Sequence, residues 1–190
     1  MSEGGTVGEA IDRHHAESGI APDGGISDRW VVIRIGRVPM PFLNTAARRR
    51  ALALHDVNHR VAGLGTGNVG EAEISAWELA SGGCGPYMAA WALDLAGMLL
   101  GMVWPIHVIR AFVAGRTMRN VYAFDPDQVR AMNLAELRQA LTRPGGRGLS
   151  SLAVFTGYLI LAVPVGAAFF IMVLVSLPVW ALTQDPIAVP

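Results

Sequence analysis

The pattern of apolar and polar positions divides the chain into a polar start, a mixed middle and a strongly apolar end. Residues 1–28 are rich in Gly, Ser, Asp and Glu and show no apolar periodicity, which predicts a flexible tail. Residues 30–42 alternate apolar side chains with arginine and then contain two prolines, so we expect an extended or irregular segment. The run from Ser151 to Thr183 has no ionisable side chain except Tyr158. Because about 20 apolar residues are enough to cross a bilayer, this run is predicted to be transmembrane.

Two helices joined by a glycine-rich loop are expected in the middle of the chain. The first starts near Asn44 or Thr45, both good N-cap residues, and ends where the glycines begin at position 63. The second covers residues 68–81 and ends at a pair of glycines. Two helices with such a short connection form a helical hairpin.

A second apolar segment, residues 86–109, is long enough to cross a bilayer but includes Asp94 and His107. Eight arginines precede it and seven follow it before residue 150, so the positive-inside preference places both of its flanks in the cytoplasm. We therefore expect a buried or membrane-dipping helix, in which Asp94 is hydrogen-bonded inside the fold or close to an active pocket. Two short helices follow, with Asp125 and Asn133 as N-caps.

These elements predict five parts along the chain. They are a flexible tail (1–28), a helical domain (29–142), a linker (143–150), a transmembrane segment (151–183) and a C-terminal tail (184–190). Pro164 and Pro178 allow either one kinked span or a re-entrant hairpin, and we favour one span. Arginines flank this segment on its N-terminal side, so the helical domain is expected in the cytoplasm and the C-terminus outside.

Composition restricts the classes of function. The chain has 15 basic and 15 acidic residues, so its zero net charge gives no sign of a nucleic-acid partner. The acidic, glycine-rich start resembles neither a signal peptide nor a transit peptide. All basic residues are arginine, as in GC-rich bacterial genomes, and we expect the protein in the cytoplasmic membrane of a bacterium. The single cysteine, Cys84, excludes an internal disulfide and is interpreted as a small residue among glycines.

Histidine and acidic side chains gather in the predicted helical hairpin. His55 and His59 are four residues apart, so on a helix their rings project from one face and can share a cation. Asp56 lies about 100° around that helix from His55 and is a further ligand candidate. Glu71, at the start of the second helix, approaches the same place from across the loop. Two imidazoles with one or two carboxylates suit zinc or another divalent first-row ion.

The residues alone leave simpler interpretations open. Glu71 stands three positions after Asn68 and fits the glutamate of a capping box, and histidines at helical spacing can simply hydrogen-bond on a surface. The loop GTGNVG, residues 65–70, matches a dinucleotide-binding pattern, but it follows a helix and lacks a βαβ context. We therefore do not expect nucleotide binding.

The spacing of these residues resembles the signature of the coenzyme Q (ubiquinone) biosynthesis protein 4 family, which is H-D-x-x-H, eleven residues, then E. The matching positions are His55, Asp56, His59 and Glu71. The connection GLGTGNVGE, the aromatic-acid pair Trp77 and Glu78, and the stretch NVYAFDPDQVRAMNLAELRQAL are also similar to segments of that family. The resemblance covers about residues 38–142.

The resemblance implies an all-α domain at a membrane face, a zinc-type ion and an apolar groove for an isoprenoid tail. The implied ligands are His55, Asp56, His59 and Glu71, with Asp56 and Glu71 as catalytic candidates and Glu78 and Asp94 as secondary candidates near the site. The family is linked to replacing the ring carboxyl of a polyprenyl hydroxybenzoate in ubiquinone synthesis. The metal would bind that carboxylate or a neighbouring oxygen. Since members typically lack a terminal span, this chain resembles a membrane-tethered variant.

Three functions are compatible with these features. The first is a metal-dependent decarboxylase or lipid-presenting factor of isoprenoid-quinone synthesis. The second is a non-catalytic, lipid-binding subunit of a larger membrane complex or homodimer, suggested by the small residues in the terminal apolar run. The third is a metal hydrolase unrelated to quinones. The sequence leaves open whether the protein turns over a substrate.

Overall fold

The computed structural model describes residues 5–18, 30–35, 38–143 and 149–183, and this part of the chain is mostly helical. Its helices are α1 (Val7–Ser18), α2 (Ala46–Ala62), α3 (Asn68–Ser81), α4 (Met88–Leu100), the 3-10 helix η1 (Gly101–Val103), α5 (Pro105–Gly115), α6 (Pro126–Ala131), α7 (Leu134–Leu141) and α8 (Leu149–Thr183). The expected extended segment is an antiparallel hairpin of β1 (Trp30–Ile35) and β2 (Val38–Leu43). The expected C-terminal tail, 184–190, and residues 144–148 of the expected linker lie outside the described residues.

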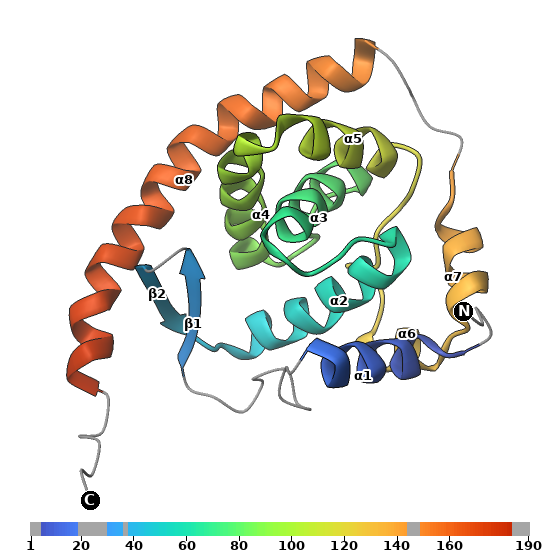
Figure 1. Cartoon of the computed structure of the whole chain (residues 1–190), viewed down its shortest axis with the longest axis horizontal. Helices are drawn as coiled ribbons and strands as arrows, with labels where there is room; N and C mark the ends of the chain where they lie inside the picture. The colour runs from blue at the N-terminus through green and yellow to red at the C-terminus, as the bar shows by residue number, and fades with distance from the viewer. Residues whose placement is uncertain (1–4, 19–29, 36–37, 144–148, 184–190) are drawn as a thin grey trace, which may run out of the picture.

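Helix α3 forms the centre of the domain. It packs most extensively against α5 and α4, and α2 crosses it on another side (Figure 1). Its side chains Ile74 and Trp77 are almost completely removed from water, as is Phe112 of α5. Close contact between α3 and α5 depends on Gly115, because a Cβ there would lie 2.5 Å from the carbonyl oxygen of Trp77. The core therefore fixes the face of α3 that is turned toward α2.

The two helices of the predicted hairpin are confirmed with their boundaries. The Thr45 side chain caps α2 by accepting a hydrogen bond from the backbone N–H of Arg48. Gly63 ends α2 in the left-handed conformation at φ 72°, which glycine adopts without steric cost. Helix α3 runs from Asn68 to Ser81, as its pattern predicts. Both ends are set by local chemistry, so the sequence is sufficient to locate them.

The apolar segment at 86–109 differs from expectation, because it is not a single helix. Helix α4 ends at Leu100, one turn of 3-10 helix follows, and α5 begins at Pro105. A proline has no N–H to donate and its ring clashes with the preceding turn, so it ends one helix and starts the next. The resulting bend folds α5 back over α3 and leaves Asp94 buried in the middle of α4.

The start of the chain also differs from expectation. Residues 7–18, placed in a flexible tail by their polarity, form α1, which lies along α6 and α2. Two apolar side chains, Val7 and Ile11, are buried there, and the backbone N–H of Val7 donates to the carbonyl of Met132 at 2.9 Å. One apolar residue per turn is enough to dock a short helix when its partner surface comes from elsewhere in the chain.

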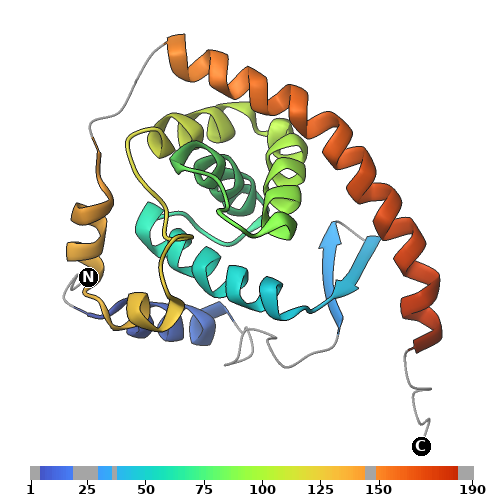
Figure 2. The same cartoon turned by 180° about the vertical axis from the view of Figure 1, so that it is seen from behind.

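Helix α8 is continuous over 35 residues, so the described chain shows one helix here and no re-entrant hairpin. It passes through Pro164 and Pro178 and curves along the outside of α4 and α5 (Figures 1 and 2). Phe155 meets Phe112 with ring centroids 5.1 Å apart, and the Ser176 hydroxyl donates to the carbonyl of Pro41 at 2.8 Å. The inner side of α8 is therefore part of the domain.

The outer side of α8 exposes large apolar residues. They include Ile160, Leu161, Val163, Phe170, Ile171, Leu174 and Val175. Within the described ranges, α8 is the one helix long and apolar enough to cross a membrane, by length and composition. An apolar surface of this length requires lipid or another apolar partner.

The glycine-rich connection between α2 and α3 provides a test of the fold. A Cβ on Gly70 would lie 2.0 Å from the carbonyl oxygen of Gly65, so Gly70→Ala must push α3 away from the loop. We expect it to lower the free energy of unfolding by about 1–3 kcal/mol, although alanine normally favours a helix over glycine. Gly65→Ala is the control, since no described atom lies within 4 Å of its added Cβ. Denaturant titration of both variants in detergent measures the difference, and equal stabilities would contradict this packing.

Candidate metal centre

Three side chains from the hairpin of α2 and α3 converge as expected. The Nε2 atoms of His55 and His59 are 3.2 Å apart, and the two rings are nearly perpendicular. The Glu71 carboxylate lies across from them, with one oxygen 3.4 Å from Nε2 of His55 and the other 3.4 Å from Nε2 of His59. One ligand atom of each residue lies within 4.8 Å of the others. The donor atoms therefore all face one point.

The geometry of the hairpin explains this convergence. Residues four apart share a face of α2, and the tight loop returns the chain so that the first turn of α3 lies opposite that face. The N-cap of α3 is Gly67, so Glu71 is four positions after the cap and not at the capping-box position. Its backbone N–H donates to the Gly67 carbonyl, while its side chain turns to the histidines. The positive end of α3 also favours a carboxylate here.

Asp56 lies outside this group. The two candidate ligand groups found among the described residues are His55, His59 and Glu71, and His55, Glu78 and Asp94. One position along α2 rotates the side chain of Asp56 away from the face that carries the histidines. Its charge acts on Arg48 instead: burial lowers the pKa of that guanidinium, and the nearby Asp56 partly restores it.

The secondary candidate Glu78 lies directly behind His55. It is completely buried, and its carboxylate accepts from Nδ1 of His55 at 3.0 and 3.1 Å, from the Asn58 amide at 2.7 Å and from the Tyr122 hydroxyl at 3.0 Å. Burial would raise the pKa of Glu78, but the charge and hydrogen bond of His55 hold it below its usual value. Glu78 is therefore an anion held by donors from several elements.

The other secondary candidate, Asp94, lies beside Glu78 in α4. Burial, and then the charge of Glu78, raise its pKa well above the usual range, which favours its neutral form. Its Oδ2 accepts from the thiol of Cys84 at 2.9 Å, and it shares a hydrogen bond with Glu78. Cys84 is thus more than the small residue expected, and burial raises the pKa of its thiol. His55, Glu78 and Asp94 thus form one hydrogen-bonded network with Asn58, Cys84 and Tyr122.

Sequence reasoning did not single out Asn58, Cys84 or Tyr122 as members of this network. The position of Asn58 in the sequence could have indicated its role, because it stands between the two histidines on the buried side of α2. Nothing in the sequence indicates the role of Tyr122, since it follows Glu78 by 44 residues and contacts it as a result of tertiary packing.

The charges at the front of the site are compatible with a bound cation. Burial alone would lower the pKa of His55, but Glu78 and Glu71 raise it well above its usual value. Burial alone would raise the pKa of Glu71, but hydrogen bonds from the two histidines lower it to about 2. Two anions thus hold a positive charge between them, which an ion bound at Nε2 can replace.

The residues present fit a divalent ion. Two imidazole nitrogens and one carboxylate form the donor set of many catalytic zinc sites, with further positions left for water or a substrate. Nδ1 of His59 is buried and has no hydrogen-bond partner among the described residues, so Nε2 is the nitrogen that faces the other donors. We infer that these three residues would hold the ion.

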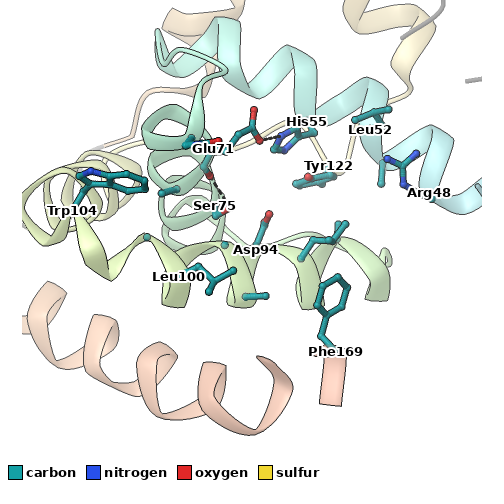
Figure 3. A pocket seen from close by; sticks show the side chains of 18 of the residues that line it. Arg48, Leu52, His55, Glu71, Ser75, Asp94, Leu100, Trp104, Tyr122 and Phe169 are labelled. Atoms are coloured by element: carbon teal, nitrogen blue, oxygen red, sulfur yellow. Dashed lines mark hydrogen bonds and ion pairs between the residues drawn. The ribbon is translucent and has the colours of Figure 1, made fainter. Parts of the chain in front are cut away.

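A cavity of about 470 Å³ opens beside the cluster (Figure 3). Its polar side carries His55, Glu71, Ser75, Asp94 and Tyr122, which come from α2, α3, α4 and the connection after α5. The remaining wall is mostly apolar and includes Leu52, Leu93, Leu100, Val103, Trp104 and Phe169. Phe169 belongs to α8, so the long apolar helix closes part of this cavity.

Comparison of the chain with known protein families, with curated proteins and with solved structures found no match.

Zinc binding is expected to weaken as the pH falls. The raised pKa of His55 means that the metal-free protein carries a proton on this ring at neutral pH, and the ion must displace it. Glu71, with a pKa of about 2, stays ionised and does not compete. The affinity should fall by about tenfold per pH unit below the raised pKa of His55. Competition with a chromophoric chelator measures this slope, and a flat profile would show that no proton is displaced.

Single alanine substitutions can identify the ligand set. We expect His55→Ala, His59→Ala and Glu71→Ala each to abolish stoichiometric zinc binding, because three donors are the minimum for such a site. Asp56→Ala should retain it, since Asp56 lies outside the group. Elemental analysis of the purified variants gives the zinc content. Loss of zinc from Asp56→Ala would instead support the four-ligand set implied by the family resemblance.

Proposed function

We propose that the protein is a membrane-associated, metal-binding protein of isoprenoid-quinone biosynthesis, which acts on or presents a polyprenyl hydroxybenzoate intermediate at its ring carboxyl. The observation that carries this proposal is that His55 and Glu71 of the cluster lie at the polar side of a mostly apolar cavity. The resemblance of the H-D-x-x-H and E spacing to the coenzyme Q biosynthesis protein 4 family supports the choice of substrate class.

The shape and chemistry of the cavity suit an amphiphile with a polar head. An aromatic ring with a carboxylate and a hydroxyl would lie at the side lined by His55, Glu71 and Asp94. The start of an isoprenoid tail would lie against the apolar wall of α4, η1 and α8. Because α8 exposes an apolar outer surface, it would keep the domain beside the bilayer that dissolves such a substrate.

The chain's own residues have defined tasks in this proposal. His55, His59 and Glu71 would hold the ion, which when bound would supply positive charge to orient the carboxylate and to stabilise negative charge that develops on the ring and its neighbouring oxygen as the carboxyl leaves. Asp94 lines the cavity, and its raised pKa keeps a proton on its carboxyl, which it donates to the Glu78 carboxylate. The apolar wall excludes water from the head of the substrate and strengthens these interactions.

The second candidate function is a lipid-binding subunit of a membrane complex. It is favoured by the exposed apolar residues along the outer side of α8, which offer a surface for another transmembrane helix. Gly166 does not contribute to such a surface, because an added Cβ would lie 3.3 Å from Leu99 of the same chain. Gly157 faces open space and can contribute to one.

Quinone measurements in cells separate these functions. In a strain whose own gene is deleted, the unchanged chain should restore quinone, whereas His55→Ala or Glu71→Ala should not, and the carboxylated polyprenyl precursor should accumulate. His107→Ala is the matched control, since this exposed histidine pairs with Glu73 away from the cluster. Lipid extracts analysed by mass spectrometry give both quantities. Normal quinone levels in both cluster variants would reject the metal-dependent role and leave the subunit role.

A further inference from the structure

The two histidines of the metal centre differ in the surroundings of their second ring nitrogen. Nδ1 of His55 lies 3.0 Å from Oε2 and 3.1 Å from Oε1 of Glu78. Nδ1 of His59 is buried without a hydrogen-bond partner among the described residues. The sequence motif treats the two residues alike, but in the described part of the chain only His55 has a hydrogen-bond partner at Nδ1.

The partners of Glu78 determine which nitrogen of His55 carries a proton. The Asn58 amide and the Tyr122 hydroxyl both donate to its oxygens, so the Glu78 carboxylate acts as an acceptor. A completely buried carboxylate also needs donors on all sides to offset its lost hydration. Nδ1 of His55 must therefore carry the hydrogen, which leaves Nε2 to supply a lone pair on the side of His59 and Glu71.

We propose that Glu78 is a positioning residue, which fixes the Nδ1–H form and the ring orientation of His55 so that Nε2 binds the ion. The inference rests on the proposed metal-binding function and adds a residue outside the ligand set. Asn58 and Tyr122 hold Glu78 in place from α2 and from the connection after α5. Among the described residues, Nδ1 of His59 has no such partner, and this ring has polar neighbours at Nε2 alone.

Substitution of Glu78 tests this role through metal affinity. Glu78→Gln keeps the shape and one acceptor oxygen, and the Tyr122 hydroxyl can rotate to accept from the new amide. We expect Glu78→Gln to weaken zinc binding about 10-fold and Glu78→Ala about 100-fold, the range found when the partner of a ligating histidine is removed. Chelator competition on full-length protein in detergent measures both affinities.

Another glutamate on α3 provides a matched control. Glu73 also pairs with Nδ1 of a histidine, His107, at 2.8 Å, but this pair lies outside both candidate ligand groups of the described chain. Glu73→Gln should leave the zinc affinity unchanged within about twofold. If Glu78→Gln binds zinc as tightly as Glu73→Gln does, Glu78 has no positioning role.

A spectroscopic measurement on the unchanged protein tests the inference even if the Glu78 variants fold poorly. In the metal-free, unchanged protein, ¹H–¹⁵N spectra of labelled histidine should show a hydrogen on Nδ1 of His55 that exchanges slowly with water. Its signal should shift in Tyr122→Phe, which leaves the contact between Glu78 and His55 intact and removes one donor behind it. The absence of that hydrogen in the unchanged protein would overturn the inference.

The proposed function and this inference fail in different ways. If the unchanged protein does not bind zinc, the metal-dependent function is rejected and the positioning role with it. If the unchanged protein binds zinc and both Glu78 variants bind it equally well, only the positioning role is rejected.

Discussion

The interior of this domain depends on one carboxylate that is entirely withdrawn from water. An unpaired buried charge is costly, so Glu78 is compatible with the fold only if donors surround it. Those donors come from α2, through His55 and Asn58, and from the connection between α5 and α6, through Tyr122. The requirements of a single side chain therefore join segments that are distant in the sequence.

Neighbouring polar groups extend this network into the backbone. Asn58 also accepts from the backbone N–H of Val121, and Asn120 donates to the backbone carbonyls of Glu78 and Gly83. These contacts hold the connection between α5 and α6 against the end of α3. The histidine cluster thus lies on a rigid support and not on a surface loop, which suits a site whose donor atoms must keep a fixed geometry.

The parts of the structure that were predicted correctly are those that depend on local chemistry. Thr45, Gly63 and the apolar periodicity define α2, and the four-residue spacing of His55 and His59 places their rings together. The break before Pro105 had a local signal that the length of the apolar run obscured. Helix α1 had almost no local signal, because its two buried residues, Val7 and Ile11, need a partner surface that other parts of the chain, including α6, provide.

The candidate site shows the same division. The front of the site, with His55, His59 and Glu71, follows from the spacing along a helical hairpin. The place of Asp56 outside that group follows from one step of helical rotation, which a sequence motif does not express. At the back of the site, Glu78 and Asp94 were expected near the cluster, but the contact with Tyr122 could not be predicted, because Tyr122 reaches Glu78 only through the packing of the fold.

The double role of α8 has a practical consequence. A terminal apolar helix is commonly treated as a removable anchor, but here Phe155 packs on α5, and Phe169 forms part of the cavity wall. Cutting the chain before residue 149 would strip the cover from α4 and open the cavity to solvent on that side. A fragment without α8 would therefore lack part of the native packing and of the cavity wall. Biochemical work should use the chain with α8, in detergent or lipid.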